Sequence, residues 1–386
     1  MPSYSSNIPK LYLIKISKWF ALTVPILMLY YQENELSSYQ SFLLKAIYSA
    51  IIIFLEIPSG YFADKLGRKN TLLIGAVMGV VGMLCYALFG GFWAFLMAEI
   101  ALGVSQSFIS GSDSAMMYDS LQVDGNEGKY AKYEGRNTAI GNGAESLAAI
   151  IGGLLAEVSF KLPFIAQTGI AFIAVPAALM LVEPPKVGLV HQTLRETFLV
   201  VRKSIFGNEK LRYFLCFSSV IGACTLTMAW IYHPYLKDAL GISLYHIGII
   251  AAVLNMIAAV FSASAHRIME KVSQYHILFS IATIIPLSYL LISYLNNSWV
   301  LVVLAVFYLM RGIATPVLKD YVNQLTPSDI RATVLSVRNF VIRMCFVFVA
   351  PLLGFITDGY GYPLAFTVIG FLFTVLSALL LLCWKK

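Results

Sequence analysis

The stretch Gly60-Tyr-Phe-Ala-Asp64-Lys65-Leu-Gly67-Arg68-Lys69-Asn-Thr-Leu72 places four charged residues between two long apolar runs. These runs, approximately Gln40–Phe62 and Thr71–Phe89, are each long enough to cross a bilayer as a helix, which takes roughly 20 residues. The glycine at position 67 permits a tight turn. The stretch is therefore expected to be a short loop between two spanning helices.

The rest of the chain has the same alternation of long apolar runs and short polar connections. Of its 386 residues, 59% are hydrophobic and 12% are charged, whereas soluble proteins carry about 25% charged residues. This pattern predicts an all-α integral membrane protein with twelve transmembrane helices. The expected spans are approximately Leu11–Tyr31, Gln40–Phe62, Thr71–Phe89, Trp93–Leu121, Tyr133–Val158, Leu162–Val182, Tyr213–Tyr235, Leu244–Ala265, Tyr275–Leu295, Trp299–Gln324, Ala332–Thr357 and Pro363–Trp384.

The twelve spans divide into two similar halves. Residues 1–182 are expected to form one six-helix bundle and residues 213–386 the other, joined by an amphipathic cytoplasmic linker at 183–212. Arg136-Asn137 near the start of the fifth span recurs 202 residues later as Arg338-Asn339 near the start of the eleventh. Transporters built from two such repeats bind their solute near the membrane midplane between the repeats, which is where we expect the site.

The distribution of Lys and Arg predicts the orientation. Short cytoplasmic loops carry the positive excess, and here most basic residues fall in loops that share one side if both termini are cytoplasmic. The net charge of +7 is spread over these loops, so no nucleic acid is expected as a partner. No cleavable leader is expected in Met1–Lys10, which suits a bacterial inner membrane. The five cysteines all lie in apolar runs, which argues against disulfides or a metal site.

The loop at 60–72 closely resembles the signature loop of the major facilitator superfamily. It has a glycine, a small residue before an aspartate, a basic residue and then Gly-Arg-Lys, at the expected place between the second and third spans. The resemblance implies that family's fold, with two pseudo-symmetric six-helix bundles, and a loop that helps to stabilise the outward-facing state. A purely topogenic role for the charges is the alternative. The expected gating residues are Gly60, which would allow close helix contact, Asp64, Gly67, Arg68, Lys69, Glu134 and Arg136.

Two features depart from the drug exporters of that family. Such exporters commonly carry an arginine in the outer part of the fourth span, where this chain has Glu99 before Gly103. They also carry a Gly-Pro and Gly-Gly pattern in the fifth span. The corresponding stretch here, Ala144–Gly153, keeps the final glycine pair but has no proline. The resemblance therefore does not establish efflux.

Three ionisable residues are expected near the membrane midplane: Glu145, Arg311 and Arg343. Each lies about 17 to 18 Å along its span at a rise of 1.5 Å per residue. An ionisable side chain at that depth is costly unless it is paired or hydrated, so it indicates function. We expect Glu145 to carry a proton, and Arg311 and Arg343 to attract an acidic group on the solute. The alternative is a static ion pair between the halves.

Three further residues are candidates for the transport site. Asp113 lies with Ser110, Ser112 and Ser114 in the inner half of the fourth span, a polar stripe expected to line a cavity or gate, and it is a second candidate for proton coupling. Trp230 and Tyr308 could line the solute cavity, although interfacial packing explains most aromatic residues in membrane proteins.

These observations predict a monomeric secondary transporter that moves a small organic anion by alternating access, coupled to protons. A proton-driven multidrug exporter is the alternative. A membrane enzyme or sensor is disfavoured, because the sequence contains no P-loop, HExxH or GxSxG motif and no large extramembrane domain. The expected partners are the solute, protons and the bilayer, with no cofactor.

Overall fold

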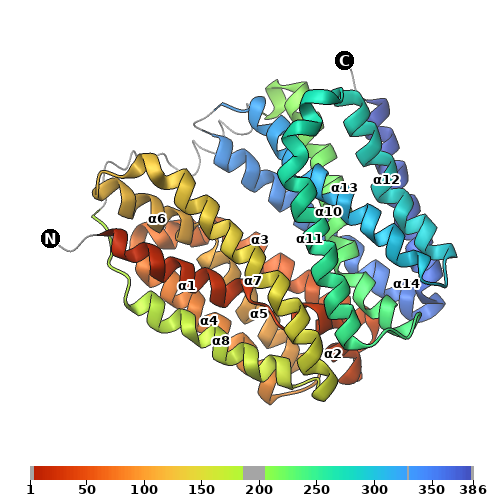
Figure 1. The fold of residues 1–386 in the computed structure, drawn as a ribbon, viewed down its shortest axis with the longest axis horizontal. Coiled ribbons are helices and arrows are strands. Elements are labelled where there is room, and N and C mark those ends of the chain that lie inside the picture. The colour runs from red at the N-terminus through yellow and green to blue at the C-terminus, as the bar shows by residue number, and fades with distance from the viewer. Residues whose placement is uncertain (1–3, 186–204, 328–329, 384–386) are drawn as a thin grey trace. The chain divides into compact units, whose positions relative to one another are not determined.

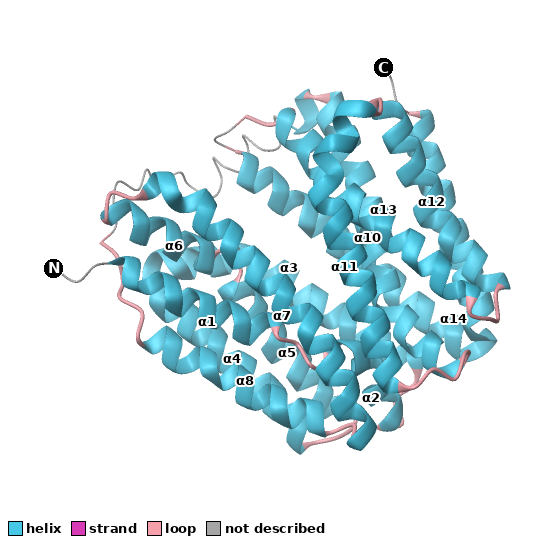
Figure 2. Cartoon of the chain, in the orientation of Figure 1, coloured by secondary structure: helices cyan, strands magenta, loops and turns pink. Residues whose placement is uncertain are grey.

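The computed structural model describes residues 4–185, 205–327 and 330–383, coloured along the chain in Figure 1. All regular elements among these residues are helices, as Figure 2 shows. The chain is therefore all-helical where it is described, in agreement with the sequence. Most of the predicted linker at 183–212 lies outside the described residues.

The helices follow the predicted spans closely. In the first half of the sequence they are α1 (Asn7–Trp19), α2 (Leu27–Glu33), α3 (Ser38–Leu66), α4 (Arg68–Leu88), α5 (Phe92–Ile109), α6 (Ser112–Val123), α7 (Tyr130–Val158) and α8 (Leu162–Leu179). In the second half they are α10 (Glu209–Asp238), α11 (Leu244–Lys271), α12 (Gln274–Tyr294), α13 (Trp299–Gln324) and α14 (Arg331–Leu382).

Eleven stretches of the described residues are long and apolar enough to cross a membrane. The last, Thr333–Leu382, has 50 residues, or about 75 Å of helix, more than twice the roughly 30 Å hydrocarbon core. Within it, Gly361 has φ of +80° and interrupts the helical conformation. α14 is therefore two helices in succession, and the eleven stretches accommodate the twelve predicted crossings.

Two predicted spans are each built from two helices rather than one. The span predicted as Leu11–Tyr31 breaks between α1 and α2, where the backbone N–H of Leu22 donates to Gln167 Oε1 of α8 at 2.8 Å. The span predicted as Trp93–Leu121 breaks between α5 and α6, at Gly111 with φ of +84°. Buried backbone groups at a helix break need a partner, and Gln167 supplies one.

The chain forms two compact units. The first comprises Met1–Leu36, Leu44–Val190 and Ser243–Ala252, and the second comprises Ser37–Leu43, His191–Ile242 and Val253–Lys386. One buried apolar cluster of the first unit joins α1, α4, α5, α6 and α8. Many large apolar side chains, such as Trp93, Val158 and Phe348, are exposed on the units, as expected of helices that contact lipid.

Candidate functional site

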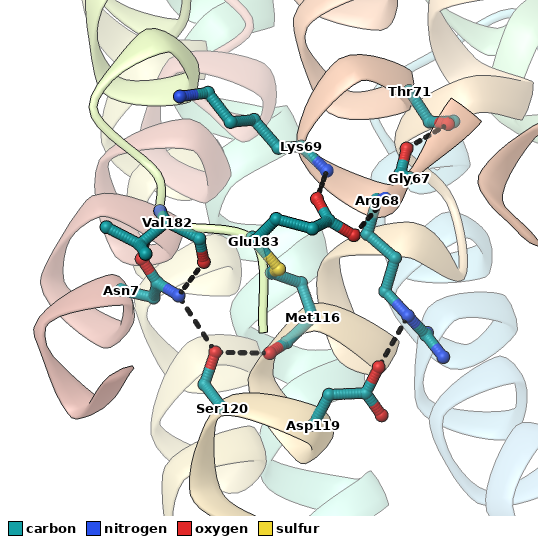
Figure 3. Close-up of polar contacts among 10 residues, drawn as sticks. All are labelled: Asn7, Gly67, Arg68, Lys69, Thr71, Met116, Asp119, Ser120, Val182 and Glu183. Atoms are coloured by element: carbon teal, nitrogen blue, oxygen red, sulfur yellow. Dashed lines mark hydrogen bonds and ion pairs between the residues drawn. The ribbon is translucent and has the colours of Figure 1, made fainter. Parts of the chain in front are cut away.

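The signature loop turns within a single residue between two helices. α3 ends at Leu66 and α4 begins at Arg68, with Gly67 between them at φ of +90°. A residue with a side chain would be strained in that conformation. The Thr71 hydroxyl, one turn into α4, donates to the Gly67 carbonyl at 2.9 Å, as Figure 3 shows. Gly67 thus sets the sharp angle at which the charged residues of the loop are presented.

A carboxylate from outside the signature binds the start of α4. Glu183 Oε1 accepts a hydrogen bond from the backbone N–H of Arg68 at 2.8 Å, and its Oε2 accepts one from Lys69 at 2.7 Å (Figure 3). The first N–H groups of a helix have no intrahelical partner and carry a partial positive charge. Glu183 therefore satisfies two of these donors and complements the charge at the end of α4.

The side chain of Arg68 binds a different acid. Its Nε lies 2.7 Å from Asp119 Oδ2 of α6, and both side chains are partly exposed (Figure 3). Together with the Glu183 contacts, this pair holds the loop to α6 and to the segment that follows α8. Two acids from different parts of the chain, Glu183 and Asp119, thus bind the end of the loop at which α4 begins.

A buried polar network holds the segment that carries Glu183. Asn7 Nδ2 of α1 donates to Ser120 Oγ at 2.9 Å and to the Val182 carbonyl at 2.8 Å, and Asn7 Oδ1 accepts from the Val182 N–H at 2.9 Å (Figure 3). Val182 directly precedes Glu183. The position of the capping carboxylate is therefore fixed from α1 and α6.

The remaining signature residues are placed as follows. An added Cβ at Gly60 would meet no described heavy atom within 4 Å, so no close helix contact depends on this glycine here. Lys69 contributes its backbone N–H to the Glu183 contact. Asp64 belongs to α3, but its side chain lies outside the described part of the structure.

Asp113 and Glu134 are linked through one serine. Asp113 is buried in the first turn of α6, where Oδ1 accepts from the Ser114 N–H at 2.8 Å and Oδ2 lies 3.7 Å from Lys15 Nζ. The Ser114 hydroxyl donates to Glu134 Oε1 of α7 at 2.8 Å. Glu134 Oε2 is buried without a hydrogen-bond partner among the described residues. The two acids thus form one polar cluster that also includes Lys15, while Arg136 on α7 is exposed.

Glu145, Arg311 and Arg343 belong to different units. Glu145 is half-buried on α7 in the first unit, and the two arginines are half-buried on α13 and α14 in the second. Arg311 lies over the ring of Tyr308, one turn earlier on α13, with its guanidinium carbon 5.0 Å from the ring centroid.

Tyr308 connects this arginine to α10. The ring of Tyr308 is buried and packs edge to face against Tyr232 at 5.8 Å between centroids. The structure therefore brings Arg311 and Tyr308 together with an aromatic residue that the sequence did not single out. Trp230, two residues before Tyr232 on α10, is half-buried.

A buried ion pair lies apart from these candidates, inside the first unit. Lys45 Nζ of α3 is 2.6 Å from Glu99 Oε1 of α5, and the two side chains are only 4% and 0% exposed. The hydroxyl groups of Tyr31 and Tyr86 also contact Glu99 Oε1, at 2.6 and 2.5 Å. Sequence reasoning placed both charges in spans but did not pair them. Their opposite signs in neighbouring spans are the signal that could have done so.

No metal centre is formed by residues 4–185, 205–327 and 330–383. In these ranges no three His, Cys, Asp or Glu side chains gather closely enough to hold an ion.

Comparison with known proteins shows similarity to a family model, to individual protein sequences and to a solved structure. The family model described as Major Facilitator Superfamily matches residues 16–350. The quinolone resistance protein NorA of Staphylococcus aureus is 26% identical over 165 residues, which cover 43% of this chain and only 42% of NorA. The MFS-type transporter YxaM of Bacillus subtilis is 22% identical over 353 residues, 89% of this chain and 87% of YxaM. The crystal structure of the nucleoside transporter NupG shares the fold, with a TM-score of 0.80 at 14% identity and full coverage of both chains.

Proposed function

Because the chain belongs to the major facilitator superfamily, and is thus a secondary transporter and not an enzyme, we propose that it carries a small organic anion across the membrane by alternating access, coupled to protons. The two bundles that move are residues 1–182 and 213–386, joined by the linker at 183–212. The chain acts as a monomer in a bacterial inner membrane with both termini in the cytoplasm, and the signature loop acts as a gate on that side.

The state of the two arginines supports an anionic solute. Arg311 lies about 18 Å along α13, counted from Trp299 at 1.5 Å per residue, and Arg343 lies about as far along α14. Among the described residues of the second unit, neither guanidinium forms an ion pair with a carboxylate. A cation held in a span without an acidic partner is costly. An acidic group on the solute would compensate both charges, and the Tyr308 ring under Arg311 would hold that guanidinium in place.

The acids of the first unit support proton coupling. Glu145 is an ionisable group in the middle of α7, and Asp113 is buried and lies in a polar cluster with Glu134 and Lys15. An ionisable side chain inside a span is costly and normally indicates a functional site such as a proton relay. In this proposal Glu145 carries the coupling proton and Asp113 is a second proton acceptor.

Transport by purified protein in liposomes tests this function. Proton flux would be followed with a trapped pH dye while organic anions such as benzoate and succinate, or the cationic dye ethidium, are added. We expect flux with an anion, and a roughly 10- to 100-fold weaker apparent affinity in Arg311→Gln and Arg343→Gln, since a charged hydrogen bond contributes about 1.5–3 kcal/mol. Glu145→Gln should lose proton flux and keep exchange of solute across the membrane.

Arg267→Gln is the matched control. Arg267 is exposed near the end of α11, so its variant loses one positive charge without touching the proposed site. If the Arg311 and Arg343 variants transport anions with the same affinity as the control, the anion assignment is wrong. If the Glu145→Gln variant also keeps full proton flux, Glu145 is a structural residue.

A multidrug exporter is the second candidate, and the match to NorA is the observation that favours it. That match covers less than half of either chain. Flux with ethidium and none with the anions would favour this candidate, because two positively charged arginines would repel a cationic solute.

A further inference from the structure

A closed cluster of polar side chains lies inside the first unit, away from the residues assigned above. It consists of Tyr31 from α2, Lys45 from α3, Tyr86 from α4 and Glu99 from α5. All four residues are buried, with relative exposures between 0 and 4%. Side chains from α2, α3 and α4 thus contact one carboxylate on α5, in the interior of a membrane protein. An ionisable group in that position normally indicates function.

Three oxygens of this cluster contact one another pairwise. Glu99 Oε1 lies 2.6 Å from the Tyr31 hydroxyl and 2.5 Å from the Tyr86 hydroxyl, and the two hydroxyls contact each other as well. Each contact needs a proton between its oxygens, and each phenol has only one to donate. Two protons are therefore available for three contacts. The third contact becomes a hydrogen bond only when Glu99 itself carries a proton.

The surroundings of the second oxygen of Glu99 support the same conclusion. Glu99 Oε2 is buried and has no hydrogen-bond partner among the described residues. An unpartnered oxygen is more costly in a carboxylate, which shares its negative charge over both oxygens, than in a neutral carboxyl group. Uptake of a proton therefore lowers the free-energy cost of burying Oε2 without a partner. It also allows all three contacts among Glu99 Oε1 and the two tyrosine hydroxyls to be hydrogen bonds.

Lys45 opposes this protonation. Its ammonium group is 2.6 Å from Glu99 Oε1 and 4.9 Å from the ring centroid of Tyr48. Around the cluster, the aromatic rings of Phe95 and Phe164 pack against Tyr86 at 5.1 and 5.3 Å. In such an apolar surrounding the attraction between Lys45 and an ionised Glu99 is strong, and it is lost when Glu99 becomes neutral. The titratable groups that face Glu99 are Tyr31, Lys45 and Tyr86.

We propose that this cluster is a second proton-binding site of the transporter, in which Glu99 takes up a proton and Lys45 is the cation that its neutralisation releases. One proton is added to Glu99 from the aqueous phase, the ion pair with Lys45 is lost, and no covalent bond of the other groups changes. That this event is linked to solute movement rests on the function proposed above, whereas proton binding itself does not. The site also accounts for the acid at position 99: Lys45 is the counter-charge that lets Glu99 remain buried.

Infrared difference spectroscopy of the purified full chain, between acidic and alkaline buffer, tests proton binding without any solute. We expect a band from a protonated carboxyl group in the unmodified protein and in Glu127→Gln, which alters an exposed acid. The band should be absent from Glu99→Gln and from the double variant Lys45→Met/Glu99→Gln, which leaves no unpaired buried charge. An unchanged set of carboxyl bands in both variants would overturn the proposal.

Tyr86→Phe extends the test if the charge variants do not fold. It keeps both charges but removes one of the three oxygens, so the carboxyl band should shift in frequency. A band that stays in place in Tyr86→Phe would show that the protonated group is not Glu99.

Transport in liposomes separates this inference from the proposed function. Under a gradient of one pH unit, one coupled proton can accumulate a solute up to about tenfold. The double variant should still exchange benzoate but accumulate up to about tenfold less of it than the unmodified chain, because one of the coupled protons is lost. If it accumulates benzoate as the unmodified chain does, proton uptake at Glu99 is not linked to solute movement, and that part of the proposal is wrong. If no variant moves any solute while the Glu99 band titrates, the proposed function fails and the proton site stands.

Discussion

Two acids bind Arg68 in different ways, and at the scale of the residue they should differ in energy. Glu183 accepts two backbone N–H groups at the start of α4, whereas Asp119 forms a partly exposed ion pair with the Arg68 side chain. Loss of a helix-capping side chain costs about 1 kcal/mol, and exposed ion pairs contribute about 0–1 kcal/mol. We expect Glu183→Ala to lower the free energy of unfolding in detergent by about 1 kcal/mol, and Asp119→Ala by less.

Glu127→Ala controls for loss of an acid at the surface of the same unit, where Glu127 is exposed. A larger loss of stability for Asp119→Ala than for Glu183→Ala would contradict the capping role. The sequence predicted the charged loop because its residues are contiguous. It could not assign these partners, because Glu183 lies 115 residues from Arg68 and only folding brings the two together.

At the scale of the element, the glycine pair of α7 is explained by close backbone contacts. A Cβ added to Gly152 would lie 2.0 Å from the Leu22 carbonyl oxygen, at the break between α1 and α2. A Cβ added to Gly153 would lie 2.7 Å from the Leu244 carbonyl, at the start of α11. The sequence showed that the pair is retained, but the break at Leu22 is not visible in hydrophobicity, because the residues on both sides of it, from Trp19 to Leu22 and from Ile26 to Tyr31, are apolar.

Gly152→Ala should therefore be strongly destabilising. The Leu22 oxygen belongs to the backbone and the added Cβ is fixed by the backbone of α7, so neither can move aside as a flexible side chain would. Overpacking of this kind costs about 1–3 kcal/mol or more. We expect a lower melting temperature in detergent and a lower yield of folded protein.

Gly143→Ala on the same helix is the matched control. A Cβ at Gly143 would meet nothing within 4 Å among the described atoms. Alanine favours a helix over glycine by about 1 kcal/mol, so this variant should be neutral or slightly stabilised. Equal melting temperatures for the two variants would show that α7 does not pack on the break as described.

At the scale of the whole molecule, residues that match between the two halves of the sequence differ in their contacts, whereas residues of different type make the same kind of contact. Arg136 and Arg338 match in sequence, yet Arg136 is exposed while Arg338 donates to Ser218. The sequence did not reveal a second pair, Glu157 and Asp358, which are 201 residues apart, because the two residue types differ. Glu157 accepts from the N–H of Tyr245, and Asp358 accepts from those of Ser38 and Tyr39, so each acid caps a helix within its own unit.

The arrangement of the whole chain across the membrane predicts which surface positions share a side. Lys129 and Lys271 are exposed in loops with the positive excess, whereas Lys161 and Asn296 are exposed in loops of the other set. Single cysteines would replace each residue in a chain whose five native cysteines are changed to alanine. In intact cells a membrane-impermeant maleimide should label Lys161→Cys and Asn296→Cys and leave Lys129→Cys and Lys271→Cys unlabelled.

Labelling after lysis is the control, because all four cysteines should then react. The two halves are tested separately, since one labelled and one protected position lie in each. If the pattern holds in the first half and inverts in the second, the number of crossings between Lys161 and Lys271 is even rather than odd, and α8, α10 or α11 does not span. If it inverts in both, the termini face outward and the signature loop cannot act as a cytoplasmic gate, although both buried proton sites would remain chemically possible.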